Sequence, residues 1–90
     1  MIIGCEGTKT AEEYFTLAEV ERNAKNIKVS LENLDNLIKH YPEHALAPQA
    51  QYLMGDIYMN DLRDFQNAIT SYNKVLENFA GSVHEAQAQF

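Results

Sequence analysis

Apolar residues recur every three or four positions along most of the chain. Two stretches keep this spacing over several turns: the first contains Ile27, Leu31, Leu34, Leu37, Ile38 and Tyr41, and the second contains Phe65, Ala68, Ile69, Tyr72, Val75, Leu76 and Phe79. Such spacing gives a helix one apolar face, and it does not fit the alternation of a β-strand. The pattern predicts an all-α protein with helices near residues 10–23, 27–41, 46–60, 65–79 and 82–90.

Helix start signals agree with these boundaries. Thr10 with Glu13, and Ser82 with Glu85, have the spacing of a capping box, in which hydroxyl and carboxylate oxygens accept bonds from otherwise unpaired amides. Asp64 is expected to cap the helix that begins at Phe65. Helices of this length are marginal in isolation, so they must be stabilised by packing on each other.

The second half of the chain repeats the first. A shift of 38 residues places the segment 31–41 on the segment 69–79, and the apolar positions of the two segments coincide. The same shift places Ala50-Gln51-Tyr52 on Ala88-Gln89-Phe90. Repetition with a period of this length is typical of stacked helix hairpins, with a third copy beginning near residue 82.

Residues 50–58 and 64–76 resemble a tetratricopeptide repeat. Gly55 and Ala68 supply the small side chains expected where paired helices cross closely. Met54, Tyr58, Tyr72 and Val75 are expected to fill the space around that crossing. The resemblance implies antiparallel helix hairpins stacked as a short right-handed superhelix of about two and a half repeats. It assigns residues 10–90 to this domain and residues 1–9 to a flexible tail or a lipoprotein tether.

Some positions depart from the repeat pattern. Lys25 stands where a turn glycine is usual, Glu21 replaces a tyrosine, and Ala80 replaces the closing proline. The second hairpin turn is one residue longer than the first, and each copy carries about three extra residues after its second helix. The longer linker, which begins with Tyr41-Pro42, is similar to the repeats of bacterial envelope lipoproteins of the barrel-assembly and division-coordinator kinds. That similarity implies a location on the periplasmic side of the outer membrane, with a cytoplasmic adaptor as the alternative.

Cys5 is a candidate for lipid modification. The run Ile2-Ile3-Gly4-Cys5 resembles the end of a bacterial lipobox, whose cysteine is modified after the signal peptide is removed. Only four residues precede Cys5, which is too short for a signal peptide, so either the start is truncated or the resemblance is a coincidence. A membrane contact is expected only through a lipid at Cys5.

Composition narrows the classes of partner. The net charge is -6, from 13 acidic and 7 basic residues, and no basic cluster offsets it. Because this charge repels a phosphate backbone, nucleic acid is not an expected partner. The single cysteine excludes an internal disulfide and any zinc site made of cysteines.

Catalytic and metal-binding constellations are not evident in the spacing. His40 and His44 are four residues apart, but Pro42 lies between them and interrupts a helix there, so both are expected to be solvated residues at the helix end and in the linker. The adjacent carboxylates Glu12 and Glu13 fit a solvated helix surface better than an acid pair. We therefore expect no enzymatic activity, cofactor or metal, although a helical accessory domain of a larger enzyme is an alternative.

The expected function is protein–protein interaction. In the resembling family the first helices of successive repeats line a concave face that binds a peptide or protein segment. The positions assigned to that face are Glu12, Phe15, Glu19, Arg22, Asn23, Gln49, Tyr52, Asp56, Met59 and Asn60. Phe15 and Tyr52 occupy equivalent places and either anchor the partner or pack between repeats. A segment with apolar side chains and some basic charge is the expected ligand, because the face carries acidic residues and Arg22 alone does not form a basic clamp.

The last predicted helix leaves an apolar edge on the stack, near Ala86 and Phe90. Three outcomes are open: the sequence is a fragment of a longer array, the short helix caps the stack, or two copies associate through this edge.

Overall fold

A computed structural model of the protein describes residues 9–79. The described residues form four α-helices, α1 (Ala11–Asn23), α2 (Ile27–His40), α3 (Leu46–Asp56) and α4 (Phe65–Asn78), and one short π-helix, η2 (Ile57–Asp61), which continues α3. No strand occurs within this range. The all-α fold class predicted from the sequence is confirmed.

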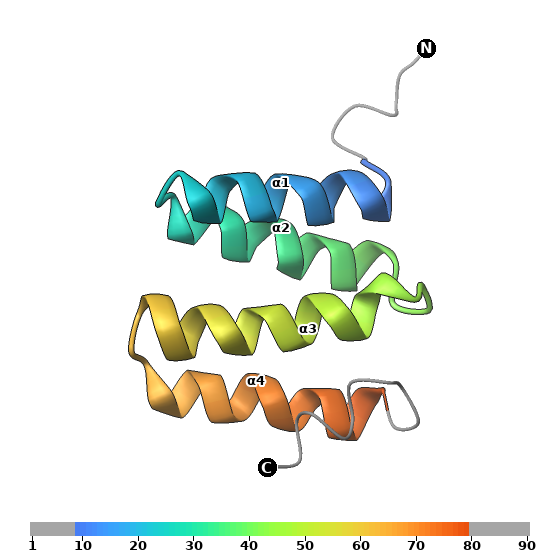
Figure 1. Ribbon diagram of the computed structural model, residues 1–90. Helices are drawn as coiled ribbons and strands as arrows, with labels where there is room; N and C mark the ends of the chain where they lie inside the picture. Colours follow the sequence, from blue (N-terminus) through green and yellow to red (C-terminus); the bar gives the residue numbers. More distant parts are fainter. Residues whose placement is uncertain (1–8, 80–90) are drawn as a thin grey trace.

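The helices form two hairpins that stack on each other. Figure 1 shows α1 beside α2 and α3 beside α4, with neighbouring helices running in opposite directions. α2 packs against α3, which joins the two hairpins, and α1 also contacts α3. This layering is that of a tetratricopeptide-like helical repeat, in which each unit buries its apolar face on the next.

Two helices begin with the caps that the sequence predicts. The Glu13 amide donates to Thr10 Oγ1 at 3.0 Å while the Thr10 amide donates to Glu13 Oε1 at 2.9 Å, which completes a capping box on α1. The Asn67 amide donates to Asp64 Oδ1 at 3.2 Å and starts α4. These contacts satisfy amides that have no partner inside their helix.

Small side chains lie at the crossing of α3 and α4, as expected. Gly55 is buried, and a Cβ placed on it would lie 2.5 Å from Tyr72 Cδ1 and closer still to Cε1. Ala68 is fully buried on the facing helix. In the first hairpin, Ser30 holds the place of Ala68 and donates to the Ala18 carbonyl at 2.6 Å. Both crossings therefore depend on residues with little or no side chain.

The third helix differs from the sequence prediction. We expected one helix over 46–60, but the α-helix ends at Asp56 and continues as a π-helical turn to Asp61. The Leu62 amide donates to the Ile57 carbonyl at 3.1 Å, which is the five-residue spacing of a π-helix. A π-turn accommodates one additional residue within a helix. The extra residue that the sequence assigned to the hairpin turn is therefore absorbed at the end of the helix.

Several predictions concern residues outside the described range. These are the fifth helix at 82–90 with its Ser82 and Glu85 pair, the edge near Ala86 and Phe90, the replacement at Ala80, and the candidate lipidation residue Cys5. The division of the chain into a tail and a domain stays a prediction for the same reason. Between residues 9 and 79, no helix has both the length and the apolar character needed to cross a bilayer.

Candidate functional site

A recess lies between α1 and α3, and we refer to it as the α1–α3 recess. It has a volume of about 350 Å³, and its lining residues are Glu19, Arg22, Asn23 and Leu53. The first three are predicted partner-binding positions, which the helical spacing of α1 brings to one face. Leu53 was not among the predicted partner-binding positions. Glu19 and Asn23 are exposed, while Leu53 is half-buried.

Arg22 is held by a partner that the sequence prediction missed. Its Nε donates to Asp61 Oδ2 at 2.7 Å and its Nη2 donates to Asp61 Oδ1 at 3.1 Å. The hydrogen bond to Arg22 lowers the pKa of the Asp61 carboxyl, and the same bond raises the pKa of Arg22. This bidentate pair ties the end of α1 to η2 across the two hairpins and offsets the positive charge of Arg22. Arg22 is therefore engaged within the protein and is not poised as a clamp for a ligand carboxylate.

A second polar group adjoins this pair on α3 and α4. The Tyr72 hydroxyl donates to Asp56 Oδ1 at 2.7 Å, and the rings of Tyr52 and Tyr72 pack with centroids 5.3 Å apart. Burial, and then the hydrogen bond to Asp56, raise the pKa of Tyr72. Burial and the charge of Asp56 also raise the pKa of Tyr52. Both tyrosine pKa values are raised because burial and the nearby Asp56 carboxylate disfavour the negatively charged phenolate form.

Arg22 is close enough to this group for their charges to interact. The negative charge of Asp56 contributes to raising the pKa of Arg22 through electrostatic attraction. The structure thus places three predicted positions, Glu19, Arg22 and Asn23, at the recess. Two more, Asp56 and Tyr52, both contact Tyr72, and Asp56 interacts with the charge of Arg22. Together these residues combine acidic, amide and aromatic groups, and the one guanidinium among them is already paired.

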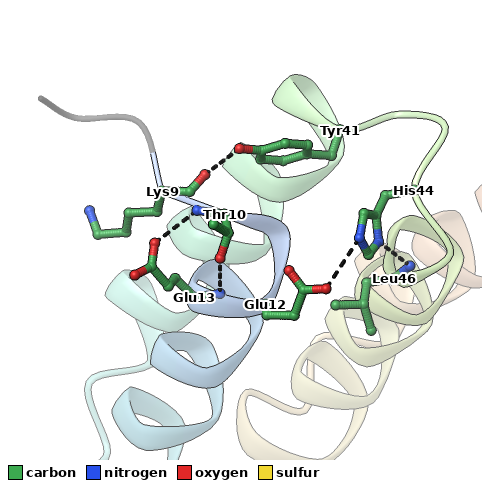
Figure 2. A network of polar contacts seen from close by, with 7 residues as sticks. All are labelled: Lys9, Thr10, Glu12, Glu13, Tyr41, His44 and Leu46. Carbon is green, nitrogen blue, oxygen red and sulfur yellow. Dashed lines mark hydrogen bonds and ion pairs between the residues drawn. The ribbon is translucent and has the colours of Figure 1, made fainter. Parts of the chain in front are cut away.

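Glu12 lies at the other end of α1. Glu19 follows it by seven positions, which is about 10 Å along a helix. Figure 2 shows Glu12 Oε2 facing His44 Nε2, at 3.4 Å, while the Leu46 amide donates to His44 Nδ1 at 3.0 Å. His44 was expected to be a solvated linker residue, but it is half-buried and accepts a bond from the first turn of α3. The reason is that α3 has no acidic residue or side-chain cap of its own at this end.

The remaining predicted positions are less engaged with the recess. Phe15 is half-buried and packs against the core, which agrees with the packing alternative for this residue. Gln49 and Met59 are half-buried, and Asn60 is exposed. None of these four residues lines the α1–α3 recess as the structure describes it.

His40 and His44 each lie against an aromatic side chain. The His40 ring stacks on Tyr14 with a centroid separation of 6.0 Å and an interplanar angle of 5°. The part of the chain from 9 to 79 holds no group of three His, Cys, Asp or Glu side chains arranged to bind a metal ion.

Residues 49–82 match the family model of the tetratricopeptide repeat. The matched segment contains most of α3 together with η2 and α4, which form the second hairpin. No curated protein and no solved structure gives a significant match to the chain. The family match supports a tetratricopeptide repeat protein. Such repeats generally mediate protein–protein interactions and are typically non-enzymatic scaffolds.

Proposed function

We propose that the protein is an interaction scaffold that binds a peptide or protein segment along the face formed by α1 and α3. The observation that carries this proposal is the α1–α3 recess, in which Glu19 and Asn23 are exposed beside the half-buried Leu53. The first helices of both hairpins contribute to it, so a ligand lying there would contact two repeats at once. The match of residues 49–82 to a repeat that generally binds proteins supports the same function.

The charges of this face favour a ligand with basic side chains. The positive charge of Arg22 is offset by Asp61, whereas Glu19 and Asp56 contribute negative charge to the same surface. A basic side chain on the ligand would complement these carboxylates, while an acidic terminus would be repelled. Apolar ligand side chains would pack on Leu53 and on the ring of Tyr52. The proposed ligand is an extended or helical segment with apolar and basic residues.

A matched pair of charge reversals tests this site. Peptides selected from a random display library on the wild-type protein provide the probe, and fluorescence anisotropy measures their affinity. Glu19→Lys should weaken binding at least about tenfold, since like charges then face each other. Glu32→Lys makes the same change on an exposed position of α2, outside the recess, and should leave the affinity unchanged. Tyr52→Ala should also weaken binding while circular dichroism shows intact helix.

The outcomes separate the proposal from its alternatives. Selection of peptides whose affinity falls equally in both charge variants would place binding elsewhere on the protein. Failure of the library to yield any specific peptide would contradict a peptide-binding scaffold of this kind.

We further propose that the scaffold belongs to a bacterial envelope lipoprotein anchored through Cys5. The support is the lipobox-like run that ends at Cys5, together with the long linker between the repeats. Metabolic labelling with a lipid precursor, in cells that express the native gene, should label the wild-type protein and not the Cys5→Ser variant. Equal absence of label in both would favour a cytoplasmic adaptor, and a catalytic domain encoded in the same reading frame would favour an accessory domain of an enzyme.

A further inference from the structure

A second hollow in the surface lies between α2 and α4, and we refer to it as the α2–α4 groove. Its volume is about 610 Å³, against about 350 Å³ for the α1–α3 recess. Met54 lines this groove whereas Leu53 lines the recess, and consecutive residues point about 100° apart around a helix. The two surfaces therefore lie on different sides of α3, and a ligand in the groove does not occupy the recess.

The floor of the groove is largely apolar. Met54, Tyr58 and Leu62 supply it from α3, from η2 and from the residue that follows η2. Ile27 and Leu31 line it from α2, one helical turn apart. Leu62 is 45% exposed, and the other four side chains are half-buried. A contiguous apolar surface with charged residues at its rim is typical of an interaction site.

The two walls of the groove differ in charge. The α2 wall carries two carboxylates and one ammonium group, from Glu32, Asp35 and Lys28, whereas the α4 wall carries the ammonium group of Lys74. All four side chains are exposed, and Asp35 already lies 3.7 Å from Lys39. Among residues 9–79, neither Glu32 nor Lys74 belongs to an ion pair. A negative charge on one wall and a positive charge on the other are therefore available to a ligand.

The groove fits a helix better than an extended strand. Its walls are helices, whose backbone amides and carbonyls already bond to one another, so they offer no row of free backbone groups to an extended peptide. A helical ligand needs none, because it satisfies its own backbone. Met54 and Leu62 are eight positions apart, which is about 12 Å along a helix and matches about two turns of such a ligand.

We propose that the α2–α4 groove binds an amphipathic helix of another protein, with basic residues on the flank that faces α2 and acidic residues on the flank that faces α4. The apolar stripe of this helix packs on Leu31 and Leu62, while Glu32 and Lys74 receive charges of opposite sign. This site is separate from the α1–α3 recess, so the scaffold holds two partners on different sides of α3.

Designed peptides test this site on the full chain. The probe is a helix-stabilised peptide of about 14 residues with leucines spaced three or four residues apart, lysines on one flank and glutamates on the other. Two reference peptides carry only lysines or only glutamates on both flanks. Fluorescence anisotropy in about 0.15 M salt measures the affinities, because exposed charges then act over only about 8 Å. The mixed peptide should bind at least about threefold more tightly than either reference peptide.

A charge reversal in the α4 wall tests the assignment of charges. In Lys74→Glu both walls carry an excess of carboxylates, so the peptide with only lysines should become the tightest ligand. Lys74 is exposed, so this substitution should leave the fold intact, as circular dichroism would show. An unchanged order of affinities in this variant would overturn the proposal.

A matched pair of substitutions locates the binding site. Leu62→Asp should weaken binding of the mixed peptide at least about tenfold, since a carboxylate is costly in an apolar contact. Val20→Asp makes the same kind of change at a 54% exposed position of α1, outside the groove, and should leave the affinity unchanged. Glu19→Lys should also leave it unchanged, which distinguishes this site from the α1–α3 recess.

Two further results would contradict the proposal. Absence of binding by the mixed peptide, or equal weakening in the Leu62→Asp and Val20→Asp variants, would remove the groove as a helix-binding site. A dimer seen by analytical ultracentrifugation that dissociates in Leu62→Asp and persists in Val20→Asp would assign the groove to a second copy of the chain.

Discussion

Replacement of Gly55 by alanine should destabilise the protein, although alanine is the better helix former. In an unobstructed helix, Gly→Ala stabilises by about 1 kcal/mol. At this position the new methyl group would lie 2.5 Å from Tyr72 Cδ1 and 3.0 Å from Cζ. Overpacking of this kind costs roughly 1–3 kcal/mol. The overlap therefore outweighs the propensity gain, and we expect a net loss of about 1 kcal/mol in the free energy of unfolding.

The overlap is costly because the Tyr72 ring is restrained. Its hydroxyl donates to Asp56 at 2.7 Å and its ring packs against Tyr52 with centroids 5.3 Å apart. Moving the ring away from Gly55 would stretch the hydrogen bond and open the aromatic contact. A freely rotating side chain would instead accommodate the methyl group at little cost.

Urea unfolding followed by circular dichroism measures this effect, and a double-mutant cycle isolates its cause. In a Tyr72→Ala background the side chain beyond Cβ is absent, so Gly55→Ala should become stabilising by about 0.5–1 kcal/mol. The sign of the substitution thus depends on the residue at position 72. A stabilising effect of Gly55→Ala in the wild-type background, or the same effect in both backgrounds, would refute the proposed crossing geometry.

Three further substitutions have defined outcomes. Lys25 adopts a φ of 72°, a left-handed conformation that costs a residue with a Cβ about 1–2 kcal/mol. Lys25→Gly should therefore raise the urea midpoint of unfolding, whereas a lower midpoint would show that this turn is unstrained. Asp61→Asn removes the pair with Arg22 and should cost at most about 1 kcal/mol at neutral pH. Because Arg22 lowers the pKa of Asp61, this contribution is complete above the usual value of 3.8 and is lost as the pH falls through the lowered pKa. The cost of the substitution, measured by unfolding, should therefore be smaller at pH 3 than at pH 7. Tyr72 has a raised pKa, so the stability that its protonated hydroxyl provides is complete below pH 10.0 and is lost at higher pH. Tyr72→Phe should therefore reduce the loss of stability at alkaline pH. An unchanged dependence of stability on alkaline pH would contradict the role of the contact between Tyr72 and Asp56.

The sequence predicted the residues of the candidate site best where they lie on a single helix, because their spacing alone sets which side of the helix they occupy. Glu19, Arg22 and Asn23 share a face of α1 because residues three or four apart lie on the same side of a helix, and the structure places all three at the α1–α3 recess. Asp61 was missed because its contact with Arg22 joins residues 39 positions apart in the sequence. The extra residue near the second turn was the one available signal, and it indicated an altered geometry without indicating the partner.

The sequence by itself determined the four described α-helices, apart from the end of α3, and their pairing. Periodic apolar residues, capping side chains at Thr10 and Asp64, and small residues at Gly55 and Ala68 are local signals, and each acts within a few residues or at one crossing. The tertiary structure alone decided the π-turn at η2, the bond of Arg22 to Asp61, and the capping of α3 by His44. These features depend on how the hairpins are positioned in space, because a polar side chain chooses its partner from whatever packing brings within reach.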